Sequence, residues 1–600
     1  MTRRQIAGTV AAVVLAVAGF GVSGASGSGV AHGVITFAET PGASPNYIFP
    51  FASCQYESTN NINQFQSLMF RPLYWFGLGG SAALVPALSP ANSPHFSNGD
   101  RTVTVTLKGW RFADGQAVDA RAVMFFLNMY RADPTAYCDY NAGFGVPDQV
   151  RTATGTANTV RITFVAPVNP NWLLYNYLSQ ITPLPNSWDR TSPTHSANCA
   201  GGVFGAASTK TSCDAVIEFL DSRAAVTSSF TGPLWQSGVD GPWRLSAFSA
   251  AGDATFVPNP HYSGPRKAQV RKVKEIAYAT SQAEQADLKA GRLSIGYLDP
   301  SVLSAGASTP GRPGPNWAPL ASSYVMTVGN TWSFNFAALN FSTADPKSAA
   351  INQLYIRQAL QISIDQNTLI QTVFKGYATP VYSPLPPQTP QALARAVANP
   401  YPYSPAGAAA LLASHGWTNV GGVLTCTSPG TGTGQCGSDI AAGYVLSFNV
   451  VVAGNSPSLA LVMYAEAASW RTLGIGVDVQ TASLANVAAD CQGGTGFEIC
   501  AWGTGWTYSP DYYPSGEALF APGGGFNVGT YDDAKMTSLI SASIHRSGTL
   551  SAYATYAAHQ LPVLYQPQAT VIQEVAKGLK SSAGFAPNPL GNFMPEYFHF

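Results

Sequence analysis

The stretch from Trp502 to Gly516 concentrates aromatic side chains around a single carboxyl group. Its sequence, WGTGWTYSPDYYPSG, holds two tryptophans and three tyrosines, and Asp511 is its only charged residue. Aromatic faces pack against apolar groups, sugar rings and cations, and a neighbouring carboxylate can bind an ammonium group or transfer a proton. Two interpretations follow: a corner of a large core, or the wall of a pocket that binds a ligand.

Hydrolysis of a polymer is the enzymatic chemistry that this stretch permits. Glycoside hydrolysis needs two carboxyl groups about 5 Å or about 6.5–9.5 Å apart in an aromatic cleft. Asp511 with Glu498 or Glu517, beside Trp502 and Trp506, is the best pair for it. A secreted hydrolase acting in an aromatic-lined cleft is therefore the alternative function.

Other catalytic motifs are missing from the sequence. It contains no Gly-Lys dipeptide and hence no Walker A loop, no G-x-S-x-G motif, and no two histidines at zinc-binding spacing. The segment GTGQCG (432–437) matches G-x-G-x-x-G, but it lies in a cysteine-bounded loop and opens no helix, so it predicts no dinucleotide site. We expect no catalytic residue, no cofactor and no metal.

Composition and charge argue against a nucleic-acid partner. The 31 basic and 31 acidic residues give a net charge of zero, and charged residues make up only 10% of the 600. No run of lysine and arginine alternates with aromatic residues, as a nucleic-acid groove requires. Hydrophobic residues reach 46%, which is enough to bury the cores of several subdomains.

The first 32 residues are typical of an export signal. Arg3 and Arg4 precede an apolar run from Ile6 to Val22, and small residues follow it. The arginine pair leaves a twin-arginine signal open, and the length of the apolar run leaves an uncleaved membrane anchor open. We expect the protein to be exported to the periplasmic space, the cell envelope or the extracellular medium.

Eight cysteines in an exported chain favour disulfides. A zinc site would need pairs of cysteines with two to four residues between them, and the chain has no such pair. Spacing along the chain instead predicts three pairs and leaves two cysteines over: Cys199 with Cys213, Cys426 with Cys436, Cys491 with Cys500, and the remaining Cys54 and Cys138.

Strand and helix patterns alternate along the chain and predict an α/β architecture. Alternating β-branched and polar residues predict strands at 34–40, 101–109, 159–167 and 270–279. Apolar residues at helical spacing predict helices after Asp119, within 351–376 and 404–417, and from Ser458 to Leu473.

Local sequence also predicts helix ends and one loop. Asp119, Asp365 and Ser404 are placed to cap helices with their side chains. Residues 191–213 are rich in Ser, Thr and Gly and contain two cysteines, so we expect a surface loop held by a disulfide.

The order of these segments resembles the extracellular solute-binding proteins of the peptide/oligopeptide class, the receptors that feed ABC importers. Residues 84–123 are similar to that family's N-terminal signature, with the Asp114-Gly115 turn in place. DGPWRLSAF (240–248), NPHYSG (259–264) and YPYSPAGAAALLASHGW (401–417) resemble further family segments, and IRQALQISIDQNTLIQTVFKGYATP (356–380) is the closest match. The likeness covers essentially the whole chain after the signal.

The resemblance implies a bilobed fold like that of periplasmic binding proteins (type II, cluster C), with three subdomains and a hinge. The division implied is an export signal at 1–32, a discontinuous lobe I at 33–66, 217–320 and 568–600, an associated subdomain at 67–216, and lobe II at 321–567. Ligand is then enclosed where the lobes meet.

The resemblance also implies a set of ligand-binding residues. GWTYSPDYYP aligns with the family's Trp-x-x-Asp-Tyr-x-Asp-Pro segment, which places Trp506 at the pocket tryptophan, Asp511 near the second acid and Ser509 where peptide-binding members carry the first acid. The full set expected to bind ligand is Trp502, Trp506, Thr507, Tyr508, Ser509 and Asp511, with Tyr47 and Phe51 from the N-terminal loop and Trp332 and Asn335 from the start of the second lobe.

Ser509 departs from the family pattern with a physical consequence. A buried ammonium group without a carboxylate partner is unfavourable by several kcal/mol, of the order that desolvated ions cost. Either Asp511 binds the amine of the ligand, or the ligand has no free amine. Modified peptides, oligosaccharides and other amphipathic solutes remain open.

The function expected from the resemblance is capture of a peptide or similar amphipathic solute between two lobes and its delivery to an ABC importer. The partners are then the solute and the permease subunits. Membrane association through the N-terminal apolar segment is open, and we expect a monomer.

Overall fold

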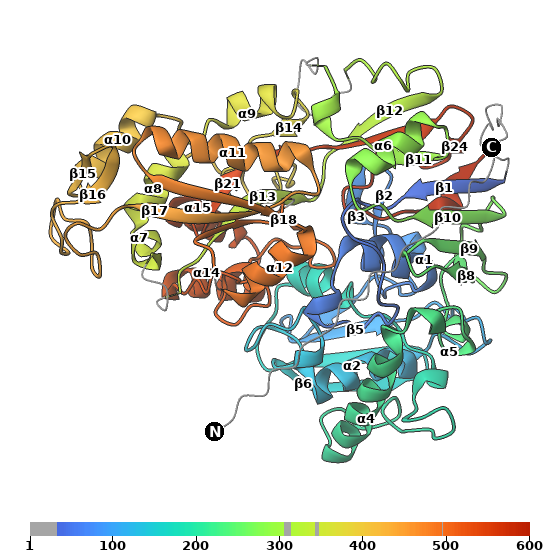
Figure 1. Ribbon diagram of the computed structural model, residues 1–600. Helices are drawn as coiled ribbons and strands as arrows, with labels where there is room; N and C mark the ends of the chain where they lie inside the picture. Colours follow the sequence, from blue (N-terminus) through green and yellow to red (C-terminus); the bar gives the residue numbers. More distant parts are fainter. Residues whose placement is uncertain (1–32, 305–313, 343–346, 495, 504) are drawn as a thin grey trace, which may run out of the picture.

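The computed structural model describes residues 33–304, 314–342, 347–494, 496–503 and 505–600, so the expected export signal at 1–32 lies outside the described residues. Two large β-sheets, each with its own helices, divide the described chain into two lobes (Figure 1). We call the part built on the seven-stranded sheet the first lobe and the part built on the six-stranded sheet the second lobe.

The sheet of the first lobe combines strands from both ends of the chain. Its order is β12-β23-β11-β1-β10-β9-β8, and β1 pairs in parallel with β10 and with β11. The bounds are β1 (Val34–Ala38), β8 (Trp243–Phe248), β9 (Ala254–Pro258), β10 (Lys272–Ile276), β11 (Ile295–Tyr297), β12 (Tyr324–Gly329) and β23 (Val571–Ala576), with helix α6 (Ser281–Lys289). The strands predicted at 34–40 and 270–279 are thereby confirmed.

A four-stranded antiparallel sheet with two helices forms the unit at the bottom of Figure 1. Its elements are β4 (His95–Ser97), β5 (Thr102–Thr106), β6 (Val150–Thr156), β7 (Thr159–Phe164), α2 (Ala120–Ala132) and α4 (Ala207–Ala224). The Asp119 carboxylate accepts hydrogen bonds from the backbone N–H groups of Arg121 and Ala122, so the predicted cap of α2 is confirmed.

The loop predicted at 191–213 is wrong in its last part, 207–213. Helix α4 begins at Ala207 and contains Cys213. Its Ser- and Thr-rich start has low helix propensity, but Val216, Ile217 and Leu220 are buried on the side that packs against α2. Tertiary packing therefore outweighs local composition here.

The six-stranded sheet of the second lobe has the order β18-β17-β19-β13-β20, with β21 also paired to β13. Its strands are β13 (Ser333–Leu339), β17 (Ser447–Ala453), β18 (Gly476–Ala482), β19 (Ile499–Ala501), β20 (Trp506–Thr507) and β21 (Val563–Gln566). Helices α8 (Leu354–Ile362), α10 (Pro405–Ala413), α11 (Pro457–Thr472), α12 (Leu484–Gly493), α14 (Ala534–His545) and α15 (Leu550–Gln560) surround it.

The helical stretch predicted at 351–376 is divided into three pieces. These are α7 (Ser348–Asn352), α8, and α9 (Gln366–Thr372). The Asp365 carboxylate accepts from the backbone N–H of Thr368 and caps α9, while the Ser404 hydroxyl accepts from Gly407 and caps α10. Both predicted caps are confirmed.

The chain crosses between the lobes at two places, which are 330–332 between β12 and β13, and 567–570 between β21 and β23. Strand β12 pairs with β23 in the first lobe, although the expected boundary at 320/321 placed it in the second. Helix α4 likewise runs across the expected boundary at 216/217. We propose boundaries near residues 330 and 224, with the two crossings as the hinge.

Four disulfides stabilise the described structure. The three pairs expected from spacing, Cys199–Cys213, Cys426–Cys436 and Cys491–Cys500, are confirmed, and Cys54 pairs with Cys138. None of the helices in the described ranges combines the length and the apolar character that a membrane crossing requires.

Candidate functional site

A cavity of about 310 Å³ lies where the two lobes meet. We call it the main cavity. Its walls come from the end of β1 (Phe37, Thr40), from β11 (Ile295, Tyr297), from the first crossing and β13 (Thr331, Ser333, Asn335), from the start of α11 (Asn455, Ser456, Ser458), from the second crossing and β23 (Gln568, Thr570, Gln573) and from residues 583–594 near the C-terminus. Residues distant in sequence therefore form one site.

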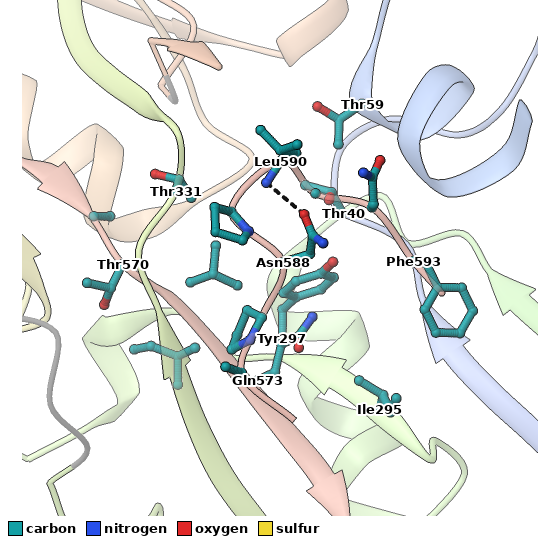
Figure 2. A pocket seen from close by; sticks show the side chains of 18 of the residues that line it. Thr40, Thr59, Ile295, Tyr297, Thr331, Thr570, Gln573, Asn588, Leu590 and Phe593 are labelled. Carbon is teal, nitrogen blue, oxygen red and sulfur yellow. Dashed lines mark hydrogen bonds between the residues drawn. The ribbon is translucent and has the colours of Figure 1, made fainter. Parts of the chain in front are cut away.

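The C-terminal segment 583–594 runs through the middle of this cavity (Figure 2). Figure 2 shows Thr331 and Thr570 on one side of the segment and Thr40 and Thr59 on the other. The backbone N–H of Leu590 donates to Asn588 Oδ1 at 2.9 Å, and the backbone N–H of Trp332 donates to the carbonyl of Pro589 at 2.8 Å. These bonds fix the segment against the first crossing.

Unpaired amide groups give the main cavity its capacity for hydrogen bonding. Within the described residues, Asn335 Oδ1, Asn455 Oδ1 and Gln568 Oε1 have no hydrogen-bond partner, and neither has Asn588 Nδ2. Asn335 is only 2% exposed. Because buried polar atoms are nearly always paired in native proteins, these three acceptors and one donor, all in residues of the cavity wall, are the atoms that a small shift of the wall would offer to a ligand's amides or hydroxyls.

Asp299 is the one charged side chain among the described residues that line the main cavity. Its Oδ2 atom accepts hydrogen bonds from the hydroxyls of Ser456 at 2.6 Å and Ser458 at 3.1 Å. Asp299 follows β11 in the first lobe, whereas both serines lie at the start of α11 in the second. The carboxylate thus joins the two lobes and leaves the rest of the lining uncharged.

Two of the expected ligand-binding residues, Asn335 and Thr507, line the main cavity. The three aromatic residues of the 502–508 stretch, Trp502, Trp506 and Tyr508, contact other parts of the protein instead. The Trp506 ring lies 4.5 Å from that of Phe526, Trp502 packs edge-on against Phe336, and the Tyr508 hydroxyl donates to the carbonyl of Pro384. Their contact with ligand stays a prediction.

Tyr47, Phe51 and Trp332 are buried in contacts within the protein. Tyr47 stacks on Tyr56, and its hydroxyl donates to Asp221 at 2.6 Å. Phe51 stacks on Tyr137, and Trp332 Nε1 donates to the carbonyl of Tyr512 at 2.9 Å. None of the three belongs to the described lining of the main cavity.

Ser509 and Asp511 are held by other side chains. The Ser509 hydroxyl accepts from Asn63 Nδ2 at 2.8 Å, and Asp511 Oδ2 accepts from Trp506 Nε1 at 3.1 Å. Burial, together with the nearby charges of Asp139 and Glu517, raises the pKa of Asp511 well above its ordinary value. The raised pKa favours the protonated form of this carboxyl group, and Asp511 is not among the described residues that line the main cavity.

The carboxyl groups considered for hydrolysis lie outside the main cavity, although Glu517 is near enough to Asp511 for its charge to raise the pKa of Asp511. Glu498 Oε2 accepts from the backbone N–H of Asn449 and lies 3.6 Å from Lys347 Nζ. Glu517 Oε1 accepts from Trp172 Nε1 and Asn176 Nδ2. Neither glutamate, nor Asp511, is among the described residues that line the main cavity.

Several lining residues were not expected from the sequence. Asp299, Asn455, Gln568 and Asn588 lie in short connections that carry no motif, and only the tertiary fold brings them together. One signal was available for the start of α11, because Ser456-Pro457 is a typical helix beginning.

Replacing Asn335 with alanine should weaken ligand binding about tenfold, the effect of losing one hydrogen bond of roughly 1.4 kcal/mol. Isothermal titration calorimetry with a peptide that the wild-type protein binds measures this change in affinity. Asn449→Ala, on β17 of the same sheet but outside the described lining, is the control and should bind as the wild type does. Equal affinities for Asn335→Ala and the wild type would remove Asn335 from the site.

Solved structures share this fold. NikZ from Campylobacter jejuni, in complex with Ni(L-His), superposes with a TM-score of 0.70 over 95% of this chain and 100% of its own, at 16% identity. The oligopeptide-binding protein AppA from Bacillus subtilis, in complex with a nonapeptide, superposes with a TM-score of 0.69 over 94% of this chain and 98% of its own, at 15% identity. The bilobed α/β fold of type II binding proteins is thereby established.

Sequence comparison leads to the same family. Protein XP55 of Streptomyces lividans is 28% identical over 154 residues, which is 25% of this chain and only 24% of that protein. Residues 84–525 match the family described as bacterial extracellular solute-binding proteins, family 5 Middle. The match spans well over half of the 600 residues and both lobes, and on this ground the chain belongs to the family 5 extracellular solute-binding proteins.

Proposed function

We propose that this protein is an exported receptor that encloses a peptide or a similar amphipathic solute between its lobes and delivers it to an ABC importer. The observation that carries the proposal is the main cavity, with its unpaired amides contributed by both lobes and by the C-terminal segment. Amide acceptors and donors match a peptide backbone, and the apolar walls match side chains.

Capture follows from a shift between open and closed forms. The hinge crossings at 330–332 and 567–570 allow the lobes to move, and a solute that touches both lobes stabilises the closed form. The hydrogen bonds from Ser456 and Ser458 to Asp299 exist only when the lobes approach. The permease then recognises the closed form, and no bond in the solute needs to change.

The range of ligands in related structures supports a search over more than one class. AppA was solved with a nonapeptide and NikZ with Ni(L-His). In this chain the uncharged lining favours a solute whose enclosed part carries no net charge, since an unpaired charge in such a cavity is unfavourable.

The test is a panel of alanine and phenylalanine peptides of two to five residues, each with a free and with an acetylated amino terminus, together with malto- and cello-oligosaccharides. A receptor should show one-to-one binding and a melting temperature raised by the ligand, and mass spectrometry should recover the ligand intact. Cleavage of a panel member would favour the secreted hydrolase. Absence of binding to the whole panel would contradict the proposal.

A further inference from the structure

A second cavity of about 70 Å³ lies beside the main cavity. Asn592 lines both. Asn63, which lines the smaller cavity, donates through Nδ2 to Asn592 Oδ1 at 2.9 Å and to Ser509 Oγ at 2.8 Å, so Asn592 is held at the place where the two spaces meet. We call the smaller cavity the acidic chamber, and its volume suits a head group rather than a whole residue.

Two carboxyl groups line the chamber, and a disulfide holds them together. Glu57 and Asp139 are both part of its wall. Cys54, three residues before Glu57, is bonded to Cys138, the residue directly before Asp139. This disulfide joins segments 84 residues apart, so the position of one carboxyl group relative to the other is fixed by a covalent link.

The charges around these two carboxyl groups are negative. Burial and the charges of Asp139 and Asp511 raise the pKa of Glu57 well above its ordinary value. Burial raises the pKa of Asp139 to about 7, with a further contribution from the charge of Glu517. Two acidic side chains thus line the chamber with the carboxyl groups of Asp511 and Glu517 nearby, and the described lining contains no basic side chain.

The arginine that stacks on Trp75, a residue of the chamber wall, belongs to a different pair. Arg71 stacks on the ring of Trp75, 3.8 Å from its centroid, and its guanidinium donates to Glu596 at 2.6 Å. Its charge is therefore matched by Glu596 and does not compensate the acids of the chamber.

An unpaired acceptor provides independent evidence that the chamber is built for a ligand. Gln180 is 6% exposed and lines the chamber, and its Oε1 atom has no hydrogen-bond partner in the described parts of the chain. Trp75, Tyr137 and Tyr512 add aromatic surface to the same wall. Carboxylates, an amide oxygen and aromatic faces are the groups that bind a cationic nitrogen.

We propose that the acidic chamber binds a cationic nitrogen of the solute, with Glu57 and Asp139 as its carboxylate partners and the bulk of the solute in the main cavity. This rests on the proposed function. The nitrogen comes from an amino terminus or from a basic side chain. The first lobe thereby supplies the negative charge that Ser509 does not.

An organic cation fits better than a metal ion. Calcium needs six to eight converging oxygens, and magnesium needs a regular octahedron. The described residues contain no group of three or more His, Cys, Asp or Glu side chains placed to hold a metal. An ammonium or guanidinium group needs only two or three acceptors and gains from the aromatic rings.

Binding of a cation should release protons. The raised pKa values of Glu57 and Asp139 favour the protonated carboxyl groups in the empty protein, and a bound cation favours their ionised forms. The titratable groups facing the chamber are Glu57, Asp139, Tyr137 and Tyr512, with the charges of Asp511 and Glu517 nearby. The proton count on binding therefore reports on this chamber.

The experiment uses the tightest-binding peptide of the panel in three forms: with a free amino terminus, acetylated, and acetylated with an added lysine. Titration calorimetry at pH 6.5 in two buffers of different ionisation enthalpy gives affinity and proton release. We expect at least one cationic form to bind ten times or more tighter than the acetylated neutral form and to release protons. The two cationic forms distinguish an amino terminus from a side chain as the source.

Glu57→Gln and Asp139→Asn should each reduce the affinity of the cationic form about tenfold, reduce proton release, and leave the acetylated form within twofold. Unchanged binding of the acetylated form shows that these variants are folded. Asp214→Asn, on the surface of α4, is the matched control and should behave as the wild type does.

Two results separate the possible failures. If the acetylated form binds as tightly as the cationic forms, or if only oligosaccharides bind, this inference is overturned while the receptor function stands. If no member of the panel binds, the proposed function fails and this inference fails with it.

Discussion

Replacing Asp299 with alanine should weaken peptide binding by roughly 30- to 100-fold, which corresponds to about 2–2.7 kcal/mol. Hydrogen bonds to a charged group contribute about 1.5–3 kcal/mol each, and Asp299 Oδ2 accepts two from the second lobe, donated by Ser456 and Ser458. The carboxylate also faces the positive end of α11. Because these contacts form only in the closed protein, their loss raises the free energy of the closed form and reduces the apparent affinity.

Two measurements check this expectation. Titration calorimetry gives the affinity for the tightest-binding peptide of the panel, and small-angle scattering gives the radius of gyration of the ligand-free protein, which should increase in Asp299→Ala. Asp365→Ala is the matched control, since Asp365 caps α9 within the second lobe alone. An Asp299→Ala protein as compact and as tight-binding as the wild type would show that this contact does not hold the lobes together.

Local sequence predicts much of the scaffold because its signals act over short distances. A carboxylate at Asp119 or Asp365 binds backbone N–H groups two or three residues later, so its position alone identifies a helix start. Cysteine spacing predicted three disulfides correctly for the same reason, since the members of each pair lie only 9 to 14 positions apart in sequence. Helix α4 was partly missed because its stability comes from packing on α2 rather than from its own residues.

The site depends on contacts that no local pattern reveals. Asn335, Asn455, Gln568 and Asn588 approach one another only after two lobes and a C-terminal segment have assembled. Trp506 shows the converse, because a residue suited to stacking on a ligand finds Phe526 and Asp511 as partners within its own lobe. The resemblance of the sequence segments to a known family therefore predicted a binding protein, whereas the polar lining required the tertiary structure.

Cys54 and Cys138, the two cysteines without a partner predicted from spacing, say more about the candidate site than the aromatic stretch 502–516 does. Once Cys54 is paired with Cys138, Glu57 and Asp139 must lie close together. Two acids brought together at a lobe boundary are an unfavourable arrangement unless they remain protonated or bind a cation. The pairing of Cys54 with Cys138 therefore points to the acidic chamber, independently of Trp506.

Raising the pH from 5 to 8 should lower the melting temperature by on the order of 5–10 °C, an estimate based on the usual unfolding entropy of a lobe of this size. Burial raises the pKa of Glu466 to about 8, and burial raises the pKa of Asp240 and of Glu574 to about 7. Between pH 5 and their folded pKa values, these groups are ionised in the unfolded chain and mostly protonated in the folded protein. The folded state binds more protons, so its stability is fully present below about pH 4 and is lost as the pH rises through the folded pKa values.

Glu466 provides the sharpest test of this linkage, because it is 2% exposed and its Oε1 atom has no hydrogen-bond partner among the residues described. Glu466→Gln keeps an acceptor for Gln566 Nε2 but cannot ionise. It should therefore flatten the dependence of unfolding free energy on pH by up to about 1.4 kcal/mol per pH unit between 5 and 8. Glu218→Gln removes an exposed carboxylate from α4 and should leave the slope unchanged. Denaturant titrations at four pH values measure both slopes, and parallel slopes for Glu466→Gln and the wild type would contradict a protonated, buried Glu466.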